Sequence, residues 1–286
     1  MPMATTTSPR YLVRNSSDKA EIAAFLNCDR LYAAYALCDL DEAYFDSCHW
    51  FLTSDSRGEI CGLVMEFGRL EPTVLFLMGE PETARAPLER ALTPAFVQIT
   101  AKPEHLASLS KRYRLRHVRD MIRMVVRKEE FRPASRQEQA ERLTMRDLPE
   151  LNRIYRLAAG GAFAPYQMET GIFYGLKVNG RLVSTAGTHV ISAAQRIVAV
   201  GNVFTHPHFR WRGYAQTVTG AVTAEALRSF GPDTPDQPEA IAILNVRADN
   251  LPAVAAYTKL GYHDALHFIE AHGSRRWLSR LWVRGS

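Results

Sequence analysis

Long apolar runs are missing from this chain of 286 residues, and none approaches the roughly 20 residues that a membrane-spanning helix needs. The first residues, Met1 to Arg10, are polar and lack the apolar stretch of a secretory signal. These two absences predict a cytoplasmic protein that has no membrane partner.

Cysteine is scarce, and the four cysteines all lie in the first half of the chain, at Cys28, Cys38, Cys48 and Cys61. They form no Cys-x-x-Cys pair, and no histidine stands at the spacing of a metal site. We therefore expect buried, reduced thiols and no bound metal.

Charge of one sign is not in large excess, since 35 lysines and arginines face 30 acidic residues and leave a net charge of +5. Part of this charge comes from the C-terminal arginines Arg275, Arg276, Arg280 and Arg284. A nucleic-acid-binding protein is one hypothesis for such a tail, but it rests on charge alone and ranks last. A polyanionic cofactor would gain equally from the same positive field.

What is present is the composition of a globular protein, with 47% hydrophobic and 23% charged residues. A length of 286 residues favours two domains. The segment from Arg127 to Arg142 is polar and shows no apolar periodicity. We predict a first domain over residues 1–133, a linker over 134–141 and a second domain over 142–286.

Apolar spacing in the second half predicts alternating helices and strands. In chain order these are a helix over Arg146–Leu157, strands over Ile172–Val178, Arg181–Val190 and Arg196–Phe204, a helix over Gly213–Phe230, a strand over Ala240–Val246, a helix over Leu251–Leu260 and a final strand. Asn179-Gly180 suits a type I′ hairpin turn, Gly201 marks a bulge, and Asn250 is the expected N-cap of the last helix. This order predicts an α/β (α+β) fold with a mixed, mostly antiparallel sheet flanked by helices.

The first half repeats that order of elements. The predicted elements are a helical region over Lys19–Leu40, strands over His49–Thr53, Glu59–Phe67 and Thr73–Met78, a helix around Leu88, a strand over Ala95–Ala101, a helix over Glu104–Lys111 and strands through Arg127. The repetition suggests two tandem copies of one fold.

The most informative segment runs from Val203 to Ala215, where a strand ends, turns and enters a helix. Such a junction presents unpaired amide N–H groups at the positive end of the helix dipole, which suits a phosphate. Gly213 and the small Ala215 allow the backbone to approach an anion, and Arg210 and Arg212 add positive charge. We predict a phosphate site at the start of this helix.

Two motifs here resemble those of the GNAT superfamily of acyl-CoA-dependent acyltransferases. The first, Arg/Gln-x-x-Gly-x-Gly/Ala, is carried by Arg210, Gly213 and Ala215, after the strand end Val203-Phe204-Thr205-His206-Pro207. The second is carried by Leu244-Asn245-Val246, Asn250, Ala253, Tyr257 and the segment Lys259–Tyr262. The resemblance covers Leu143 to His267, and the repeated element order extends it to a two-domain form with a GNAT-like first half.

The resemblance implies an N-acetyltransferase that moves an acetyl group from acetyl-CoA to a primary amine through a tetrahedral intermediate. It also implies that the pantetheine arm lies between splayed strands, around Asn202–Thr205 and Leu244–Val246. The residues that it assigns to the cofactor are Val203, Phe204, Thr205, Arg210, Trp211, Arg212, Gly213, Tyr214, Ala215, Asn245, Asn250 and Tyr257.

By the same resemblance, Tyr257 would protonate the thiolate leaving group; without the motif, it would be taken for an inward packing residue of its helix. The general base is left open, because the strand Arg196–Phe204 carries no carboxylate. The candidates are His189, Glu169 and a water polarised by Asn202 or by a backbone carbonyl. His206 and His208 are expected to flank the phosphate loop instead.

The first half departs from the family pattern at Gly79–Ala84. Glu80 and Glu82 would repel a pyrophosphate, and Pro81 removes an amide donor. We expect a degenerate domain that does not bind CoA and supports the catalytic half.

Other functions and partners stay open at this point. A non-catalytic acyl-CoA sensor is the alternative to an enzyme, and a longer acyl donor or an acyl-carrier-protein donor would also suit, because spacing does not encode cavity depth. The acceptor is expected to be an amine-bearing small molecule or peptide, such as an amino acid, a polyamine, an aminoglycoside or a protein N-terminus. A homo-oligomer is compatible with the sequence.

Overall fold

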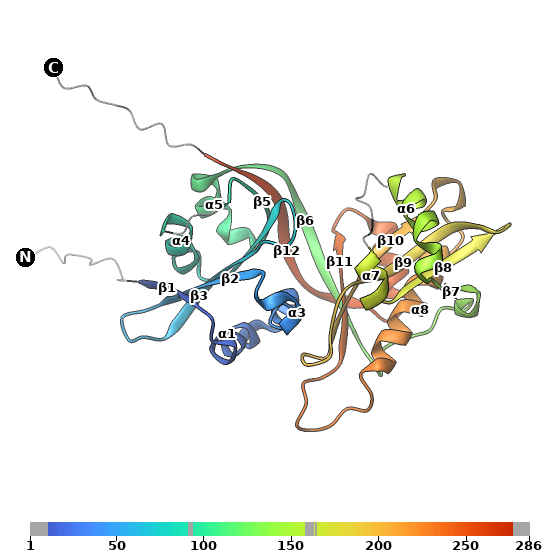
Figure 1. The fold of residues 1–286 in the computed structure, drawn as a ribbon, viewed down its shortest axis with the longest axis horizontal. Helices are drawn as coiled ribbons and strands as arrows, with labels where there is room; N and C mark the ends of the chain where they lie inside the picture. Colours follow the sequence, from blue (N-terminus) through green and yellow to red (C-terminus); the bar gives the residue numbers. More distant parts are fainter. Residues whose placement is uncertain (1–10, 91–93, 158–162, 164, 277–286) are drawn as a thin grey trace, which may run out of the picture. The chain divides into compact units, whose positions relative to one another are not determined.

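A computed structural model describes residues 11–90, 94–157, 163 and 165–276 (Figure 1). The expectations for Met1–Arg10 and for the tail residues Arg280 and Arg284 lie outside these residues. Within them, no helix is both long and apolar enough to cross a membrane. Cys28 is exposed, so the expectation of uniformly buried thiols is wrong at that position.

Two compact units make up the chain. Unit 1 consists of Met1–Asp120 together with Phe268–Ser286, and unit 2 consists of Met121–His267. This division differs from the predicted linker at 134–141. The reason is that strand β6 (Tyr113–Arg127) starts in unit 1 and ends in unit 2, while β12 (His263–Arg275) starts in unit 2 and ends in unit 1.

Unit 1 contains the helices and strands that the first half of the sequence predicts, together with a short first strand. Its elements are β1 (Leu12–Ser16), α1 (Lys19–Leu26), η1 (Asn27–Asp29), α2 (Ala34–Cys38), α3 (Glu42–Phe45), β2 (Cys48–Ser54), β3 (Ile60–Phe67), β4 (Thr73–Gly79), α4 (Pro81–Arg90), β5 (Phe96–Ala101), η2 (Pro103–His105) and α5 (Leu106–Arg112). β1 is missing from the sequence prediction because its five residues, LVRNS, show no apolar alternation.

The sheet of unit 1 runs in the order β1-β2-β3-β4-β5-β12, followed by the first part of β6. β4 and β5 pair in parallel, whereas β5 and β12 pair in antiparallel fashion from Ile269↔Ala101 to Ser274↔Phe96. Ile269 and Ala271 of β12 are buried in the same apolar core as Leu75 of β4. The last described strand of the chain is therefore part of the core of unit 1.

Unit 2 contains every helix and strand that the second half of the sequence predicts except the final strand, β12, most of which belongs to unit 1. Its elements are η3 (Gln137–Gln139), β7 (Glu141–Arg142), η4 (Met145–Asp147), α6 (Leu148–Arg156), α7 (Pro165–Thr170), β8 (Phe173–Val178), β9 (Arg181–Ser192), β10 (Ile197–Thr205), η5 (Pro207–Phe209), α8 (Tyr214–Ser229), β11 (Ile241–Arg247) and α9 (Leu251–Thr258). The strand order β6-β11-β10-β9-β8-β7 is antiparallel except for β10 with β11. The predicted mixed, mostly antiparallel sheet flanked by helices is confirmed.

Local sequence signals account for the connections in unit 2. Asn179 and Gly180 have φ angles of 51° and 73°, as the predicted type I′ turn between β8 and β9 requires. Gly261, with φ 95°, ends α9. Asn250 stands at the N-cap position of α9, as predicted, and its side chain makes no capping hydrogen bond. That side chain is exposed instead.

Candidate active site

β10 and β11 part in the middle of the unit 2 sheet. Their parallel pairing runs from Ile197↔Ile241 to Val200↔Leu244, and β10 then continues to Thr205 with a shift of register between Gly201 and Phe204. This irregularity is the bulge predicted at Gly201. The two strands therefore separate at the positions that the sequence motifs indicate, beyond Val200 and Leu244.

The main chain of β10 presents polar groups on the side of this separation. The amide of His206 donates to the carbonyl oxygen of Val183 on β9, at 2.9 Å. Because main-chain groups alternate sides along a strand, those of Val203 and Thr205 face away from β9. The Thr205 carbonyl accepts a hydrogen bond from Nε of Arg210 at 3.3 Å. The side chain of Phe204 packs instead in an apolar cluster with Tyr155.

The chain then turns through η5 and enters α8 at Gly213. Gly213 is the N-cap residue and adopts the left-handed conformation, with φ 80° and ψ 0°. The first intrahelical bond that follows joins the Thr217 amide to the Gly213 carbonyl at 3.0 Å. The amides of Tyr214, Ala215 and Gln216 precede it, so they point out of the helix start, where a phosphate would accept from them.

Space and positive charge surround this helix start. A β-carbon built on Gly213 would meet no atom within 4 Å. Arg212 is exposed, with its guanidinium carbon 5.3 Å from the centroid of the Phe209 ring, and Trp211 is 86% exposed. Neither Arg210 nor Arg212 forms an ion pair with any residue that the structure describes. His206 and His208 flank the turn, with ring centroids 5.2 Å apart, as expected.

Tyr257 lies on α9 and is almost completely buried, with 7% of its surface exposed. Burial raises the pKa of Tyr257 to about 12. Its ring lies 6.3 Å from that of Tyr262, and its hydroxyl makes no hydrogen bond within the described part of the chain. Tyr257 therefore keeps its proton at neutral pH and has not committed it to a protein acceptor.

His189 is the candidate base that lies at the bulge of β10. Its Nε2 is 3.2 Å from Oδ1 of Asn202, and a β-carbon built on Gly201 would fall 2.4 Å from its ring. His189 remains exposed, yet desolvation by the surrounding protein lowers its pKa, against the opposing effect of the Asn202 hydrogen bond. A lowered pKa keeps the imidazole neutral, and hence able to accept a proton, near pH 7.

Two other candidate residues, Asn245 and Glu169, lie in different surroundings. One of the two polar atoms of the Asn245 side chain on β11 already has a protein partner. Its Oδ1 accepts a 3.0 Å hydrogen bond from Nε of the buried Arg123. Glu169 lies exposed on α7, and its side chain forms no ion pair or hydrogen bond with a described residue.

Sequence reasoning missed Tyr155 of α6 as a neighbour of this site. Its ring makes an edge contact with Phe163 at 4.6 Å and lies 6.1 Å from Phe204. Burial raises the pKa of Tyr155, and ionisation of Tyr257 would raise it further. Tyr155 carries no specific signal in the sequence, because it falls on the apolar stripe of its helix and this position favours a packing residue.

The comparison with protein families matches residues 138–262 to the acetyltransferase (GNAT) family. This match shows a GNAT domain over residues 138–262. The match includes both sequence motifs and the separated strands β10 and β11. Acetyl-CoA-dependent acyl transfer is the general activity of the family, and the GNAT domain is an acyltransferase domain.

Solved structures extend the GNAT fold to the whole chain. A Drosophila protein superposes with a TM-score of 0.66 at 13% identity, covering 93% of this chain and 99% of its own. A tandem GNAT protein from the clavulanic acid biosynthesis pathway has a TM-score of 0.56 at 10% identity, with 93% and 98% covered. A GNAT-family protein from Novosphingobium aromaticivorans has 0.51 at 22%, with 71% and 84% covered. No curated protein matches the sequence.

The strand–helix junction of unit 1 that corresponds to Gly213 is closed. Gly79, at the end of β4, has φ 103°, and a β-carbon built there would lie 2.4 Å from the carbonyl oxygen of Cys61. Thr83 Oγ1 donates to that same carbonyl, at 2.9 Å. Packing against β3 therefore fills the space that is open at Gly213 in the GNAT domain.

Proposed function

We propose that this protein is an N-acetyltransferase that transfers the acetyl group of acetyl-CoA to a primary amine. The observation that carries the proposal is that a single strand, β10, both separates from β11 and leads into the open, amide-lined start of α8. Acetyl-CoA fits this combination, because its pantetheine arm is an extended chain with hydrogen-bonding amides and leads to an anionic pyrophosphate.

Each part of the cofactor would have its own partners in the chain. The amides of Tyr214 and Ala215 would hold the pyrophosphate, with Arg210 and Arg212 adding charge. The main chain of Val203 and Thr205 faces the separation, where it suits the amides of a pantetheine arm. Asn250 has its side chain free of capping and would lie along that arm. Bound acetyl-CoA supplies the activated acetyl group.

Tyr257 and His189 would move the two protons of the reaction. His189, held neutral, accepts the proton of the acceptor amine, either directly or through a water that Asn202 polarises. Tyr257 would donate its hydroxyl proton to the sulfur as the carbon–sulfur bond breaks, because burial keeps this hydroxyl protonated until then. Unit 1 takes no part in holding CoA, since its junction at Gly79 is packed shut.

Acetyl-CoA is expected to stabilise the protein against heat, by roughly 2.7 kcal/mol at about 100 times its dissociation constant. Gly213→Val should abolish this shift, because its side chain would occupy the space where the anion approaches. Valine at φ 80° also strains the backbone by about 1–2 kcal/mol, so the unliganded variant should melt earlier. Differential scanning fluorimetry with and without acetyl-CoA measures both effects.

Gly213→Ala is the matched variant, because it carries the same backbone strain with a single methyl group. It should show a smaller ligand shift than wild type, and Gly213→Val should show none. An equal shift in all three proteins would contradict the phosphate site, and no shift in the wild type would contradict acetyl-CoA as the donor. Thiol release from acetyl-CoA in the presence of small amines or peptides then identifies the acceptor.

His189→Gln is expected to slow acetyl transfer by about 100-fold and to remove one limb of the pH–rate profile. In the wild type, the rate should fall as pH decreases through a value below about 6.5, because the pKa of His189 is lowered and the protonated ring no longer accepts a proton. The limb that belongs to the acceptor amine, near pH 10, should remain.

Glu169→Gln is the control for this assignment, because Glu169 is the other side chain that the sequence offers as the general base. Steady-state rates between pH 5 and pH 9 should be the same for Glu169→Gln and wild type. A loss of the acid limb in Glu169→Gln, with the limb retained in His189→Gln, would reverse the two assignments.

A further inference from the structure

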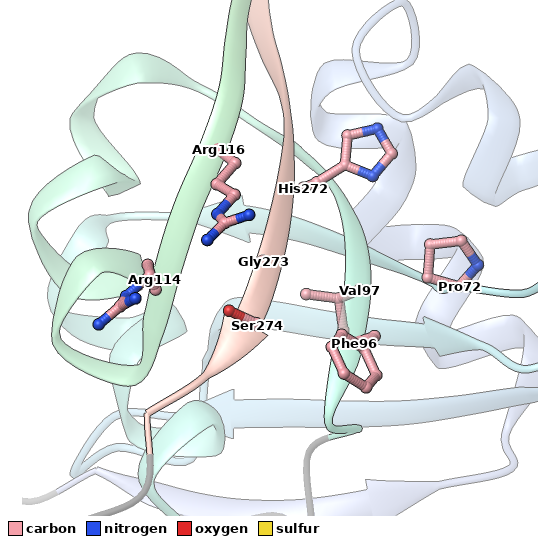
Figure 2. A pocket seen from close by; sticks show the side chains of 8 residues that line it. All are labelled: Pro72, Phe96, Val97, Arg114, Arg116, His272, Gly273 and Ser274. Carbon is pink, nitrogen blue, oxygen red and sulfur yellow. The ribbon is translucent and has the colours of Figure 1, made fainter.

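Unit 1 contains a cavity of about 310 Å³ that the acetyl-transfer site does not use (Figure 2). The side chains that matter come from four segments of unit 1: Pro72 before β4, Phe96 on β5, Arg114 and Arg116 on β6, and His272 and Ser274 on β12. Figure 2 shows the two arginines on one side of the β12 strand, and Phe96 and Pro72 on the other.

Strand alternation explains why these side chains share one face. Tyr113 and Leu115 of β6 pack on the apolar core of unit 1, so Arg114 and Arg116 point to the opposite face. Ser274 is paired with Phe96 in the β12–β5 register, which places these two side by side on that same exposed face.

The two arginines of the cavity lack partners. Arg114 and Arg116 form neither an ion pair nor a hydrogen bond with any residue that the structure describes. Two other guanidinium groups, by contrast, are compensated by carboxylates: Arg85 pairs with Glu89 at 2.6 Å, and Arg127 pairs with Glu239 at 2.8 Å. No carboxylate lines the cavity. Its electrostatic complement is therefore an anion.

An apolar surface lies beside this charge. Phe96 is 68% exposed, which is unusual for a large aromatic side chain, and Pro72 adds a second apolar wall. Arginines on an exposed strand can also prevent the strand from pairing with the sheet edge of another protein molecule. That role does not account for the exposed Phe96 nearby. The pairing of two guanidiniums with an aromatic ring fits an anion that carries a flat apolar group.

We propose that this cavity is a second ligand site, which binds a small aromatic oxyanion, either a carboxylate or a phosphate ester. The guanidinium groups of Arg114 and Arg116 hold the oxyanion, with the His272 ring and the Ser274 hydroxyl as further donors, and the ring of the ligand packs on Phe96 and Pro72. The volume suits a ligand of one ring, at the lower end of the range for small-molecule sites. All of its residues belong to unit 1, so this binding is separate from acetyl-CoA binding.

Isothermal titration calorimetry with phenyl phosphate, benzoate and inorganic phosphate tests the proposal on the full chain. Wild-type protein should bind phenyl phosphate or benzoate saturably, and the tighter of the two identifies the oxyanion. The double variant Arg114→Gln/Arg116→Gln should weaken that binding at least tenfold. Phe96→Ala should weaken phenyl phosphate while leaving inorganic phosphate unchanged. Because these residues are exposed, all variants should melt at the wild-type temperature.

The matched control is Arg57→Gln/Arg119→Gln, which removes the same charge from two exposed arginines of unit 1 that do not line the cavity. This control should bind like wild type, and so should Gly213→Val. Saturable binding of neither aromatic anion would overturn the proposal, and so would equal weakening in the two double variants. Loss of binding in Gly213→Val would assign the probe to the start of α8 instead.

Discussion

Replacing Tyr257 with phenylalanine is expected to slow acetyl transfer by about 10²- to 10⁴-fold while leaving the dissociation constant of acetyl-CoA unchanged. The substitution removes only the hydroxyl group, so the ring can keep its packing on α9 beside Tyr262. The magnitude follows from the role of a general acid, which lowers the barrier by supplying a proton as the sulfur departs.

The state of the Tyr257 hydroxyl is what makes this effect large. Burial raises the pKa of Tyr257 to about 12, so the group stays protonated through the whole working range of pH. Its pH profile should therefore show no basic limb below pH 10 that belongs to this residue. A thioester whose thiol is more acidic than that of CoA needs less protonation, and with such a donor the rate loss in Tyr257→Phe should shrink.

Tyr262→Phe is the matched control for that experiment. Tyr262 is as deeply buried, but its hydroxyl already has a partner, Oγ1 of Thr223, at 2.8 Å. Its loss should lower the melting temperature by a few degrees and leave kcat near the wild-type value. Full activity of Tyr257→Phe at neutral pH would make Tyr257 a packing residue, and the proton donor would have to be another group, such as the phenol of Tyr155.

Ending the chain at His267 is expected to unfold unit 1. The truncation removes Phe268, Ile269 and Ala271, each 1% exposed, and leaves β5 without its antiparallel partner. Burial of a phenylalanine or isoleucine side chain contributes about 1.5–3 kcal/mol, and the lost strand pairing adds to this. Together these losses are comparable with the whole stability of a domain.

Hydrogen–deuterium exchange measures this outcome one strand at a time. In the truncated protein, amides of β4 and β5 should exchange much faster than in wild type, while the β8–β9 hairpin of unit 2 should keep its protection. A chain that ends at Arg276 is the control, because it retains all of β12. Wild-type protection of β5 after truncation at His267 would show that unit 1 does not depend on the strand.

The sequence predicted the parts of the fold whose signals are local. Asn179-Gly180 specifies its turn through two positive φ angles, and Gly213 specifies the left-handed start of α8. The motif around Gly213 also indicated the separation of β10 from β11, through its family resemblance. Such features depend on a few neighbouring residues, and their physics can be evaluated without the rest of the chain.

What could not be predicted depends on partners distant in sequence. The residues Tyr113–Arg127 have the pattern of a strand. That pattern does not indicate that the first part of the strand joins unit 1 and the last part pairs with β11. Likewise, the proposal of His189 over Glu169 as the base rests on the bulge that brings Asn202 to the imidazole. A histidine on one strand and an asparagine on the next carry no joint signature in a single sequence.

The late position of β12 also bears on how the protein is made. Unit 1 lacks its partner for β5 until Phe268 and the residues after it have been synthesised, although its other strands come first. All of Met121–His267 is translated in between, which takes on the order of 10 s at usual ribosomal rates. During this interval the nascent chain carries an unpaired strand edge, which is a target for chaperones. A nonsense mutation near the end of the gene therefore disrupts the unit whose synthesis begins first.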